Sequence, residues 1–540
     1  MVSKMYVGAT TTVASGRECT AAISINSGVK QGCPLSPVLF NLIMDELVTE
    51  VDGLPTGVSI GESRVSIMAF ADDLVLLSNS RSDMESLLKK ASGFFDKRHL
   101  SVNARKCQSL QVLPCKGRAS MRVTEEVHRW FGGVPIPSMT YEALAKYLGV
   151  HFDPHGKIVV KQTELETWCE RLATAALKPY QKVRGLKEVV VPRLLHQLRM
   201  SDWGIAKLSG LDRVLRKWYK KYLHLPEWTH TPWIHHRAGG TLPSVLDLVT
   251  RSRYAAALKA QQSVDPVTVA VSQAPLDSAR RTLERLHMDT ASALAVKKCQ
   301  LKQKETSLRA THNGQAKHAM LTSSCISRNY IWRGCLHGKS MINSLRILSG
   351  TLPTKLNLHR GHTAAQDLLC RRCHEAPETD MHVLQTCDLN KDLRVARHNV
   401  LVNKIGKELR KIGYEVQLER SYFIDQERLK PDITAFRGGR CYLIDVAVPY
   451  EASVNRLRDR EAKKERKYGV LRWEHINAEL GQFETRAVGI AVGAAGTVLT
   501  QTLSKLMKLG LSKRIVQSLS ISAIAGSAKL WGVHERAGIG

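Results

Sequence analysis

The adjacent aspartates Asp72 and Asp73 lie inside an otherwise apolar run, SIMAFADDLVLLSNS. Buried carboxylates without a partner destabilise a fold, so a pair in this setting needs a cation. Successive strand residues point to opposite faces, so one aspartate can bind a metal ion directly while the other supports it. We take Asp72 as the direct ligand. A polar hairpin tip without a metal is the alternative for the pair alone.

A second set of residues has the spacing of zinc ligands. The segment CRRCHEAPETDMHVLQTC contains Cys370, Cys373, His382 and Cys387 in the order C-x2-C-x8-H-x4-C. Three thiolates and one imidazole suit a closed tetrahedral Zn²⁺ site, which has no open position and is therefore structural. His374 is adjacent to Cys373 and is poorly placed to replace His382. Four unligated residues are the alternative.

A second carboxylate pair, Asp432 and Asp445, lies in LKPDITAFRGGRCYLIDVAVPYE. The apolar stretches around the RGGR turn predict two antiparallel strands, which can bring both carboxylates to one end of a sheet. There they can hold Mg²⁺, which activates water for phosphodiester cleavage. The P-D-(x12)-D spacing resembles that of restriction-like nucleases, although Ala447 stands where their lysine is usual. Ordinary ion pairs with neighbouring Arg and Lys are the alternative.

Some related nucleases carry this lysine on a later helix instead, and this sequence resembles them. The segment DREAKKERKYGV supplies Lys464, four residues before Tyr468. Lys464 would orient the attacking water and offset charge on the phosphate. The preceding amphipathic segment RVARHNVLVNKI carries Arg397 and His398, which either touch DNA or belong to a solvated helix start. Glu408 is a further candidate acid from that helix.

The elements around the first aspartate pair are predicted to be a loop, a helix and a hairpin. Gly32 allows positive φ in the loop. Ser36 followed by Pro37 predicts a helix start with Ser36 as the N-cap, and Gly53 ends this helix. Backbone amides and Gln31 near the helix start can hold an anionic ligand such as a nucleotide. VSIMAF and LVLLS then predict two strands buried against helices, with the aspartates at their turn.

The segment LDRVLRKWYKKYLHLP predicts an amphipathic helix with a basic face. Leu211, Leu215 and Trp218 share the apolar face, while Arg213 and Lys217 belong to the opposite face. The aromatic residues are read as core. The basic face is a candidate for contact with a phosphate backbone.

The bulk composition favours a polyanionic partner. The 540 residues include 79 Lys and Arg against 49 Asp and Glu, which gives a formal net charge of +30. Nucleic acid is the leading partner, and a merely soluble basic protein is the alternative. The 12 cysteines show no regular disulfide framework, and no signal peptide opens the chain, so we expect an intracellular, reducing compartment. The apolar window at residues 487–503 is interpreted as buried strand or helix, with no membrane span.

Four ordered segments resemble reverse transcriptase motifs: the QG-P-LSP-LFN loop and helix, the F-ADD hairpin, the L-x-N-x-x-K segment of LSVNARKCQSL and the YLG hairpin of YEALAKYLGVHFD. The resemblance is to reverse transcriptases of non-LTR retrotransposons. It implies that Asp72 and Asp73 bind two Mg²⁺ ions and that Gln31 and Gly32 line the nucleotide pocket. It also implies that Lys106 helps to neutralise the leaving pyrophosphate.

The first metal aspartate of that family lies upstream of the QG loop, and residues 1–25 contain no aspartate. A two-metal site needs several fixed oxygen ligands. We therefore expect this chain to be the carboxy-terminal part of a longer polypeptide and not to polymerise by itself.

Nearly the whole chain resembles the polyproteins of site-specific retrotransposons of the R-two type, which carry a restriction-like endonuclease. The expected fold is α+β and multidomain. It comprises a partial palm, a helical thumb, a basic helical linker, a zinc knuckle of the CCHC type and a restriction-like α/β nuclease, at residues 1–155, 156–310, 311–367, 368–390 and 391–540 respectively.

The resemblance implies target-primed reverse transcription, in which the nuclease nicks target DNA and the freed 3′-hydroxyl primes copying of the element's RNA. It implies an element RNA template, target DNA in a ribosomal RNA gene, and a place of action in the nucleus, within the nucleolus. A non-catalytic nucleic-acid-binding remnant is one alternative. An intron-encoded maturase-type reverse transcriptase is another, although the H-N-H histidine cluster typical of such proteins is missing from the sequence.

Overall fold

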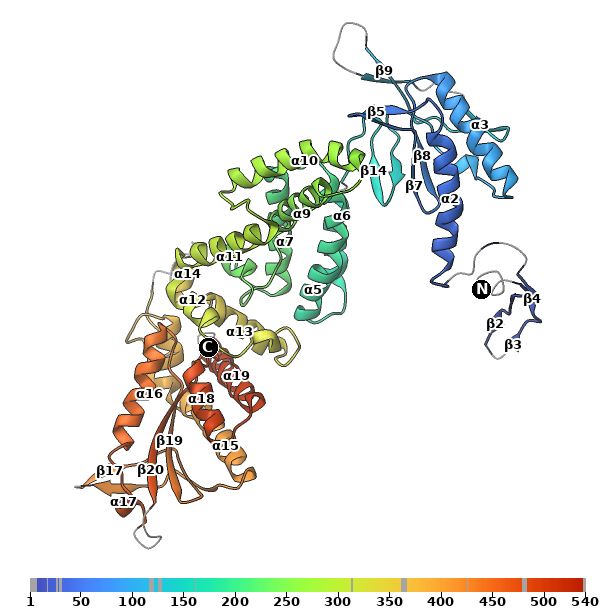
Figure 1. Ribbon diagram of the computed structural model, residues 1–540. Coiled ribbons are helices and arrows are strands. Elements are labelled where there is room, and N and C mark those ends of the chain that lie inside the picture. Colours follow the sequence, from blue (N-terminus) through green and yellow to red (C-terminus); the bar gives the residue numbers. More distant parts are fainter. Residues whose placement is uncertain are drawn as a thin grey trace. The chain divides into compact units, whose positions relative to one another are not determined.

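The computed structural model describes residues 7–537, except residues 17, 26–27, 29–31, 116–120, 125–128, 161, 312–313, 361–366, 425 and 478–482. Helices and strands both occur, in agreement with the predicted α+β class (Figure 1). The chain forms two compact units. The first contains residues 1–160, 197–202 and 253–279, and the second contains residues 161–196, 203–252 and 280–540.

The core of the first unit lies between two helices and a hairpin. Helix α2 (Ser36–Asp52) and helix α3 (Arg81–Lys97) pack through Met44, Leu47, Leu87 and Phe94, together with Ile67 of the hairpin. Helix α2 begins at Ser36, so the predicted N-cap at Ser36 is wrong. Leu35 is the cap residue and makes no side-chain cap hydrogen bond, while a proline occupies the first turn as predicted.

The predicted hairpin around the first aspartates exists, but its strands are more exposed than the sequence predicts. Strand β7 (Ile67–Phe70) pairs antiparallel with β8 (Asp73–Leu76), with Phe70 opposite Asp73. Ala71 at the turn has φ of 51°, which suits a tight hairpin turn. Met68 is 42% exposed and Phe70 is 63% exposed. The reason is that β7 and β8 form a two-stranded sheet with only one face on the helices.

The other strands of this unit form small antiparallel pairs. Their bounds are β1 Thr10–Thr11, β2 Ala14–Ser15, β3 Glu18–Cys19, β4 Ile23–Ser24, β5 Val58–Ile60, β6 Ser63–Val65, β9 Gln111–Pro114, β10 Met121–Thr124, β11 Arg129–Phe131, β12 Val134–Ile136, β13 Ala145–Tyr147 and β14 Val150–Phe152. The pair β13 and β14 is the predicted YLG hairpin, and its turn residues Leu148 and Gly149 both have positive φ.

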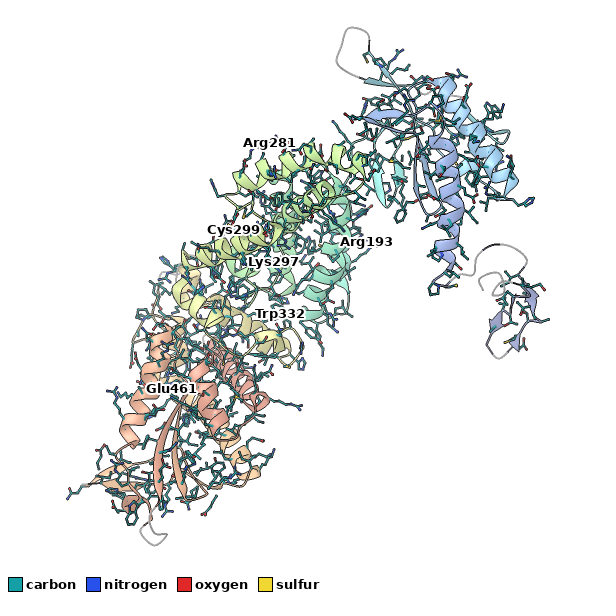
Figure 2. All side chains as sticks on the ribbon, viewed as in Figure 1. Arg193, Arg281, Lys297, Cys299, Trp332 and Glu461 are labelled. Atoms are coloured by element: carbon teal, nitrogen blue, oxygen red, sulfur yellow. The ribbon has the colours of Figure 1, made fainter. Side chains whose placement is uncertain are left out.

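Helices dominate the middle of the chain. Their bounds are α4 Gln162–Thr174, α5 Pro179–Gly185, α6 Val191–Met200, α7 Ile205–Tyr222, α8 Thr231–His235, α9 Val245–Gln261, α10 Pro266–Arg285, α11 Ala293–Arg309, α12 Gly314–Thr322, α13 Gly338–Ser349 and α14 Lys355–Arg360. Figure 2 labels Arg281 of α10 and Lys297 of α11 among their many basic side chains. The predicted two-faced helix is confirmed in α7, where Leu211, Leu215 and Trp218 are buried and Arg213 and Lys217 are exposed.

A four-stranded sheet organises the last part of the chain, in the order β15-β18-β19-β20. Its strands are β15 Glu415–Leu418, β18 Ile433–Arg437, β19 Arg440–Ala447 and β20 Glu484–Ala491, and a hairpin of β16 Tyr422–Ile424 and β17 Glu427–Leu429 lies outside it. The helices are α15 Lys391–Lys411, α16 Val454–Tyr468, α17 Trp473–Asn477, α18 Thr500–Lys508 and α19 Lys513–Arg536. Strands β19 and β20 are parallel, so the chain crosses over between them through α16 and α17.

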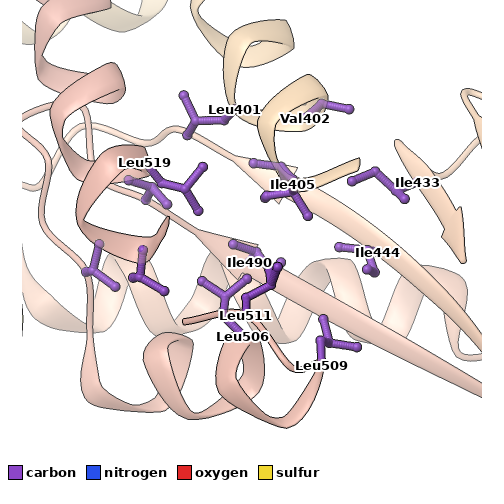
Figure 3. Packing of buried hydrophobic residues seen from close by; sticks show 14 of the residues in the cluster. Leu401, Val402, Ile405, Ile433, Ile444, Ile490, Leu506, Leu509, Leu511 and Leu519 are labelled. Carbon is purple, nitrogen blue, oxygen red and sulfur yellow. The ribbon is translucent and has the colours of Figure 1, made fainter. Parts of the chain in front are cut away.

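Both faces of this sheet are covered. Figure 3 shows the larger core, where Ile433, Ile444 and Ile490 of the sheet lie among leucines of the surrounding helices. The helical residues come from α15 (Leu401, Val402, Ile405), from α18 and the residues after it (Leu506, Leu509, Leu511) and from α19 (Leu519). Side chains alternate along a strand, so Cys441 and Leu443 point to the other face, where they pack with Tyr468 of α16.

The apolar window at residues 487–503 holds part of β20, a connecting segment and the start of α18, in agreement with the prediction of buried strand or helix. Among the described residues, no helix has the length and apolar character needed to cross a bilayer.

Candidate functional sites

Strand register brings Asp432 and Asp445 together. Ile433 of β18 pairs with Ile444 of β19, so continuing the antiparallel register by one residue places Asp432 opposite Asp445. Gly438 and Gly439 close the hairpin with positive φ at its other end, as the RGGR segment predicted. The two carboxylates therefore share one end of the hairpin.

Asp432 accepts two well-defined hydrogen bonds. The backbone N–H of Val446 donates to its Oδ2 at 2.7 Å, and Nε2 of His398 lies 3.1 Å from the same oxygen and 3.1 Å from the carbonyl oxygen of Val446. Burial opposes both charges, but these contacts outweigh it. They lower the pKa of Asp432 and raise the pKa of His398 to about 9. Asp432 is therefore held as an anion.

Asp445 faces Lys464 of α16. The Nζ of Lys464 donates to Oδ1 of Asp445 at 2.7 Å, and the side chain of Asp445 is 3% exposed against 32% for Lys464. Burial and then the charge of Asp432 raise the pKa of Asp445, while Lys464 opposes this shift. Tyr468, one turn after Lys464, donates from its hydroxyl to the carbonyl oxygen of Lys430 at 2.9 Å and also contacts Asp445. The crowded carboxylate pair thus favours a cation.

Helix α16 is fixed by its own buried acid. Glu461, labelled in Figure 2, accepts hydrogen bonds from the backbone N–H of Ala491 at 3.1 Å and from Lys505 at 2.8 Å. The closeness of helix and strand depends on Gly489 of β20, because a Cβ there would lie 2.3 Å from the carbonyl oxygen of Glu461. These contacts set the position from which Lys464 reaches Asp445.

Two expectations for helix α15 are wrong. Arg397 is 3% exposed and donates to Ser527 of α19 at 2.8 Å, so it packs in the interior and cannot touch DNA. Glu408 pairs with Lys411 at 2.7 Å, and it lies ten residues after His398, about 15 Å along the helix. His398 itself belongs to the Asp432 cluster. Its role was not predicted, because the pairing joins residues of two separate elements and leaves no local sequence signal.

The predicted zinc ligands converge. The candidate ligand atoms of Cys370, Cys373, His382 and Cys387 all lie within 4.8 Å of one another. The sulfurs of Cys370 and Cys387 are 4.0 Å apart, and Nε2 of His382 lies 3.3 Å from the sulfur of Cys373. Thiolates and an imidazole at such separations fit Zn²⁺. His374 is exposed, has φ of 57° and does not belong to this group.

An overlapping group shares one of these cysteines. The candidate ligand atoms of Cys370, Glu378 and His534 also lie within 4.8 Å of one another, and all three residues are buried. Glu378 accepts from the backbone N–H of Arg371 at 2.8 Å and from its guanidinium at 2.6 Å. Burial opposes the charge of Glu378, but the hydrogen bonds from His534 and Arg371 hold its pKa well below the usual range.

The first aspartate pair is not buried, so the expectation of burial is wrong. Asp72 and Asp73 are both exposed at the tip of the hairpin. Burial and then the charge of Asp73 raise the pKa of Tyr147 in the YLG hairpin, which places that hairpin near the aspartates. Within the described part of the chain, neither aspartate belongs to a group of three or more His, Cys, Asp or Glu side chains arranged for a metal.

The remaining predicted polymerase residues are only partly described. Gly32 has φ of 81°, which agrees with its predicted conformational role. Gln31 lies outside the described residues. Lys106 is exposed on a short helical turn, Ala104–Lys106. The roles predicted for these residues in nucleotide binding stay predictions.

Comparison with known proteins extends the match beyond single motifs. Residues 2–152 match the family described as "Reverse transcriptase (RNA-dependent DNA polymerase)". A "Retrovirus-related Pol polyprotein from type-2 retrotransposable element R2DM" of Drosophila melanogaster is 30% identical over 430 residues, which cover 78% of this chain and 40% of that protein. A Pol polyprotein from a type-1 retrotransposable element R2 of Popillia japonica is 30% identical over 441 residues, 80% of this chain and 60% of that protein.

A similar Pol polyprotein of Nasonia vitripennis is 28% identical over 78% of this chain and 40% of its own length. The chain thus spans about half the length of these relatives. The reverse transcriptase match and alignments over about four-fifths of the chain show that it belongs to the Pol polyproteins of R2-type non-LTR retrotransposons.

Proposed function

We propose that residues 391–540 form a Mg²⁺-dependent DNA endonuclease that nicks the target of an R2-type element. The observation that carries this proposal is the cluster of Asp432, Asp445 and Lys464 at one end of the sheet, with Lys464 2.7 Å from Asp445. A carboxylate pair beside a lysine is the arrangement that the P-D-(x12)-D spacing led us to expect. Arrangements of this kind support hydrolysis of phosphodiesters.

The donor set fits a hard divalent cation. Asp432 and Asp445 offer carboxylate oxygens only, and Mg²⁺ is commonly held by one or two carboxylates while it keeps several waters. Bound Mg²⁺ supplies an activated water and offsets charge on the phosphate. Among the protein groups, Val446 N–H and His398 keep Asp432 ionised. Lys464 contributes a positive charge directly beside Asp445, the more deeply buried of the two carboxylates.

The test is a nicking assay on supercoiled DNA that carries ribosomal gene sequence, with Mg²⁺ or with EDTA. Asp445→Asn keeps the shape of the side chain and removes its charge, and we expect it to lower nicking at least 100-fold. Lys464→Ala should lower nicking about 10- to 1000-fold. Lys463→Ala is the matched control, because Lys463 is exposed on the same helix and the charge change is identical.

Loss of nicking in Asp445→Asn and in EDTA, with activity retained in Lys463→Ala, would support the endonuclease. Equal nicking by the wild type and Asp445→Asn would assign the activity to a contaminant and contradict the proposal. Binding of DNA without nicking would favour the alternative of a non-catalytic nucleic-acid-binding protein.

For the amino-terminal region we propose a part of the polymerase palm. The family match covers residues 2–152, and Asp72 and Asp73 stand on the hairpin that the motif predicts. In this proposal the two aspartates hold Mg²⁺, Gln31 and Gly32 contact the nucleotide, and Lys106 offsets charge on pyrophosphate. A two-metal site needs further oxygen ligands, which the described residues do not bring to this pair.

We therefore expect this chain to extend a primer on an RNA template no more than its Asp72→Asn variant does. Adding polypeptide that supplies another metal-binding carboxylate should restore extension. Processive synthesis by the chain alone, abolished in Asp72→Asn, would show that the site is complete and would contradict this expectation.

For the third site we propose a structural Zn²⁺ held by Cys370, Cys373, His382 and Cys387. Elemental analysis should find one zinc per chain, and Cys373→Ser should lose it. As partners of the whole assembly we propose an element RNA as template and DNA of a ribosomal RNA gene as target, with action in the nucleus, at the nucleolus. These partners rest on the family relationship, and crosslinking followed by sequencing of the bound RNA and DNA tests them.

A further inference from the structure

His534 reaches the proposed zinc site from the far end of the sequence. It lies in the last turn of α19, is fully buried, and its Nε2 is 3.9 Å from the sulfur of Cys370 and 3.3 Å from Oε2 of Glu378. His382 and His534 therefore both point a nitrogen at the cysteines. A tetrahedral site with three cysteines takes one of them.

The side-chain amide of Asn390 determines which nitrogen of His534 carries the proton. Arg372 contacts Oδ1 of Asn390, and a guanidinium can only donate. Nδ2 of Asn390 donates to the carbonyl oxygen of Val383 at 3.0 Å, which can only accept. Both contacts require the same amide orientation, so the Nδ2 group is also the one that faces Nδ1 of His534 at 3.0 Å.

Nδ1 of His534 is consequently an acceptor without a proton. A neutral imidazole then carries its proton on Nε2, the nitrogen that faces Cys370 and Glu378. A metal bond from Nε2 would require the proton to move to Nδ1, where it would meet the N–H of Asn390. His534 is thus arranged to donate a hydrogen bond and not to bind a metal.

His382 has the opposite arrangement. Its Nδ1 lies 3.3 Å from Oγ1 of Thr386. The Thr386 hydroxyl donates to the carbonyl oxygen of His382, so its oxygen can accept a hydrogen bond from Nδ1–H. Nε2 of His382 lies 3.3 Å from the sulfur of Cys373. With the proton on Nδ1, Nε2 has a free electron pair directed at the cysteines. An imidazole whose other nitrogen donates to a neighbour is the usual arrangement of a metal ligand.

We propose that His534 is the outer hydrogen-bond donor of the zinc site and joins the last helix to the knuckle, with His382 as the fourth ligand. Its Nε2–H points at the Cys370 sulfur and the Glu378 carboxylate, and Glu378 in turn holds the knuckle loop through Arg371. This inference rests on the proposed zinc site. It goes beyond that site because it assigns a role to a residue outside the CCHC segment.

The contact of His534 with Cys370 and Glu378 also links the proposed zinc site to the core of the proposed nuclease domain. Helix α19 packs against α15, and Ser527 of α19 accepts the hydrogen bond of Arg397, the neighbour of His398. A metal that binds only the folded knuckle stabilises every element docked on it. Metal binding should therefore stabilise α19 and the sheet that α19 covers.

The test uses the full chain loaded with Co²⁺, whose visible spectrum reports coordination geometry and whose sulfur-to-metal charge-transfer band reports hydrogen bonds to the thiolates. The variants are His534→Ala, His534→Gln, which keeps an N–H donor, and His382→Ala. Ser520→Ala is the control for packing of α19, because Ser520 is buried on the same helix and bonds to the carbonyl oxygen of Gly496. Zn²⁺ affinity is measured by competition with a chelator.

His534→Ala should keep the tetrahedral Co²⁺ spectrum, shift the charge-transfer band and weaken Zn²⁺ binding about 10- to 100-fold. His534→Gln should recover part of both effects, Ser520→Ala should change neither, and His382→Ala should lose the tetrahedral spectrum. A tetrahedral spectrum lost in His534→Ala but kept in His382→Ala would overturn the assignment. So would wild-type affinity and an unshifted band in His534→Ala. A wild-type chain that binds neither Co²⁺ nor Zn²⁺ would overturn the zinc site itself, which separates the two failures.

Discussion

At the scale of single residues, the pair of His398 and Asp432 is the clearest effect of the tertiary structure. His398 comes from α15 and Asp432 from the start of β18, and their side chains are 3.1 Å apart. Each charge stabilises the other in a half-buried setting, and the backbone N–H of Val446 adds to Asp432. His398 thereby fixes a candidate metal ligand in its ionised form and in one orientation.

This pair gives the stability of the protein a defined pH dependence. The pKa of His398 rises from 6.5 in the unfolded chain to about 9 in the fold. A raised pKa contributes stability in full below about pH 6.5, and that stability is lost as the pH rises through about 9. After a discount for solvent screening, we expect the contribution to be about 1–2 kcal/mol.

The measurement is the melting temperature of the wild type and His398→Gln between pH 5.5 and 9.5. At the acid end of this range the wild type should have a higher melting temperature than His398→Gln. The difference in melting temperature between the two proteins should shrink towards zero above about pH 9. His475→Gln is the control, because His475 is an exposed histidine in the same domain. A difference that stays constant over the whole range would mean that His398 contributes by packing and not by charge.

At the scale of elements, the βαβ crossover from β19 to β20 positions the lysine. Strands β19 and β20 are parallel neighbours, and α16 packs on β20. The helix lies close to the strand because Gly489 has no side chain, and Glu461 then anchors the helix to the backbone N–H of Ala491. Lys464 reaches Asp445 only from a helix at that height above the sheet.

Gly489→Ala tests this arrangement. The added methyl group would lie 2.3 Å from the carbonyl oxygen of Glu461, so α16 has to move away from β20. We expect a loss of about 1–3 kcal/mol in the free energy of unfolding and a loss of nicking, because Lys464 moves with the helix.

Denaturant unfolding and the nicking assay together give the measurement. Gly210→Ala is the matched control, because a Cβ at Gly210 in α7 meets nothing within 4 Å. It should be neutral or stabilising by up to about 1 kcal/mol, since alanine is a better helix former than glycine. Wild-type nicking in Gly489→Ala would show that the close approach of α16 is unimportant for the site.

At the scale of the whole molecule, charge is the dominant property. The net charge of +30 is spread over helices and strands of both units, and many of the basic side chains are exposed. The exposed face of α7 is one ordered example, with Arg213, Lys217 and Lys221 on the side away from its core. Binding of nucleic acid by such faces releases counterions and depends strongly on salt.

Neutralising that face should reduce the salt dependence of binding. For the triple variant Arg213→Ala, Lys217→Ala, Lys221→Ala, the slope of log affinity against log salt for duplex DNA should become shallower by up to about 3, at about 0.9 for each lost phosphate contact. The measurement is fluorescence anisotropy at several salt concentrations.

The charge-matched control removes Lys508, Lys513 and Arg514, which are exposed near the end of the chain. An equal change of slope in both triple variants would mean that total charge, and not the α7 face, governs binding.

The sequence was sufficient for patterns that act over short distances. The two glycines of RGGR, the alternation of Cys441, Leu443 and Asp445, and the cysteine spacing of the knuckle depend on backbone geometry within one or two elements. Such patterns predicted the hairpins, the helix α7 and the convergence of Asp432 with Asp445. The choice of Lys464 also agrees with the geometry. The i and i+4 spacing places Lys464 and Tyr468 on one face of α16, and both side chains contact Asp445.

Only the tertiary structure decided which distant residues complete each site and which predicted positions are buried. His398 at Asp432 and His534 at the knuckle join elements far apart in sequence, and neither pairing leaves a local pattern. Arg397 is buried because α19 covers that side of α15, and the hairpin of Asp72 and Asp73 is exposed because one of its faces has no layer in the described structure. The sequence determined the short-range geometry of the chemistry, because that geometry follows from the backbone periods of strand and helix. The surroundings of each site depend on packing between layers, which those periods do not encode.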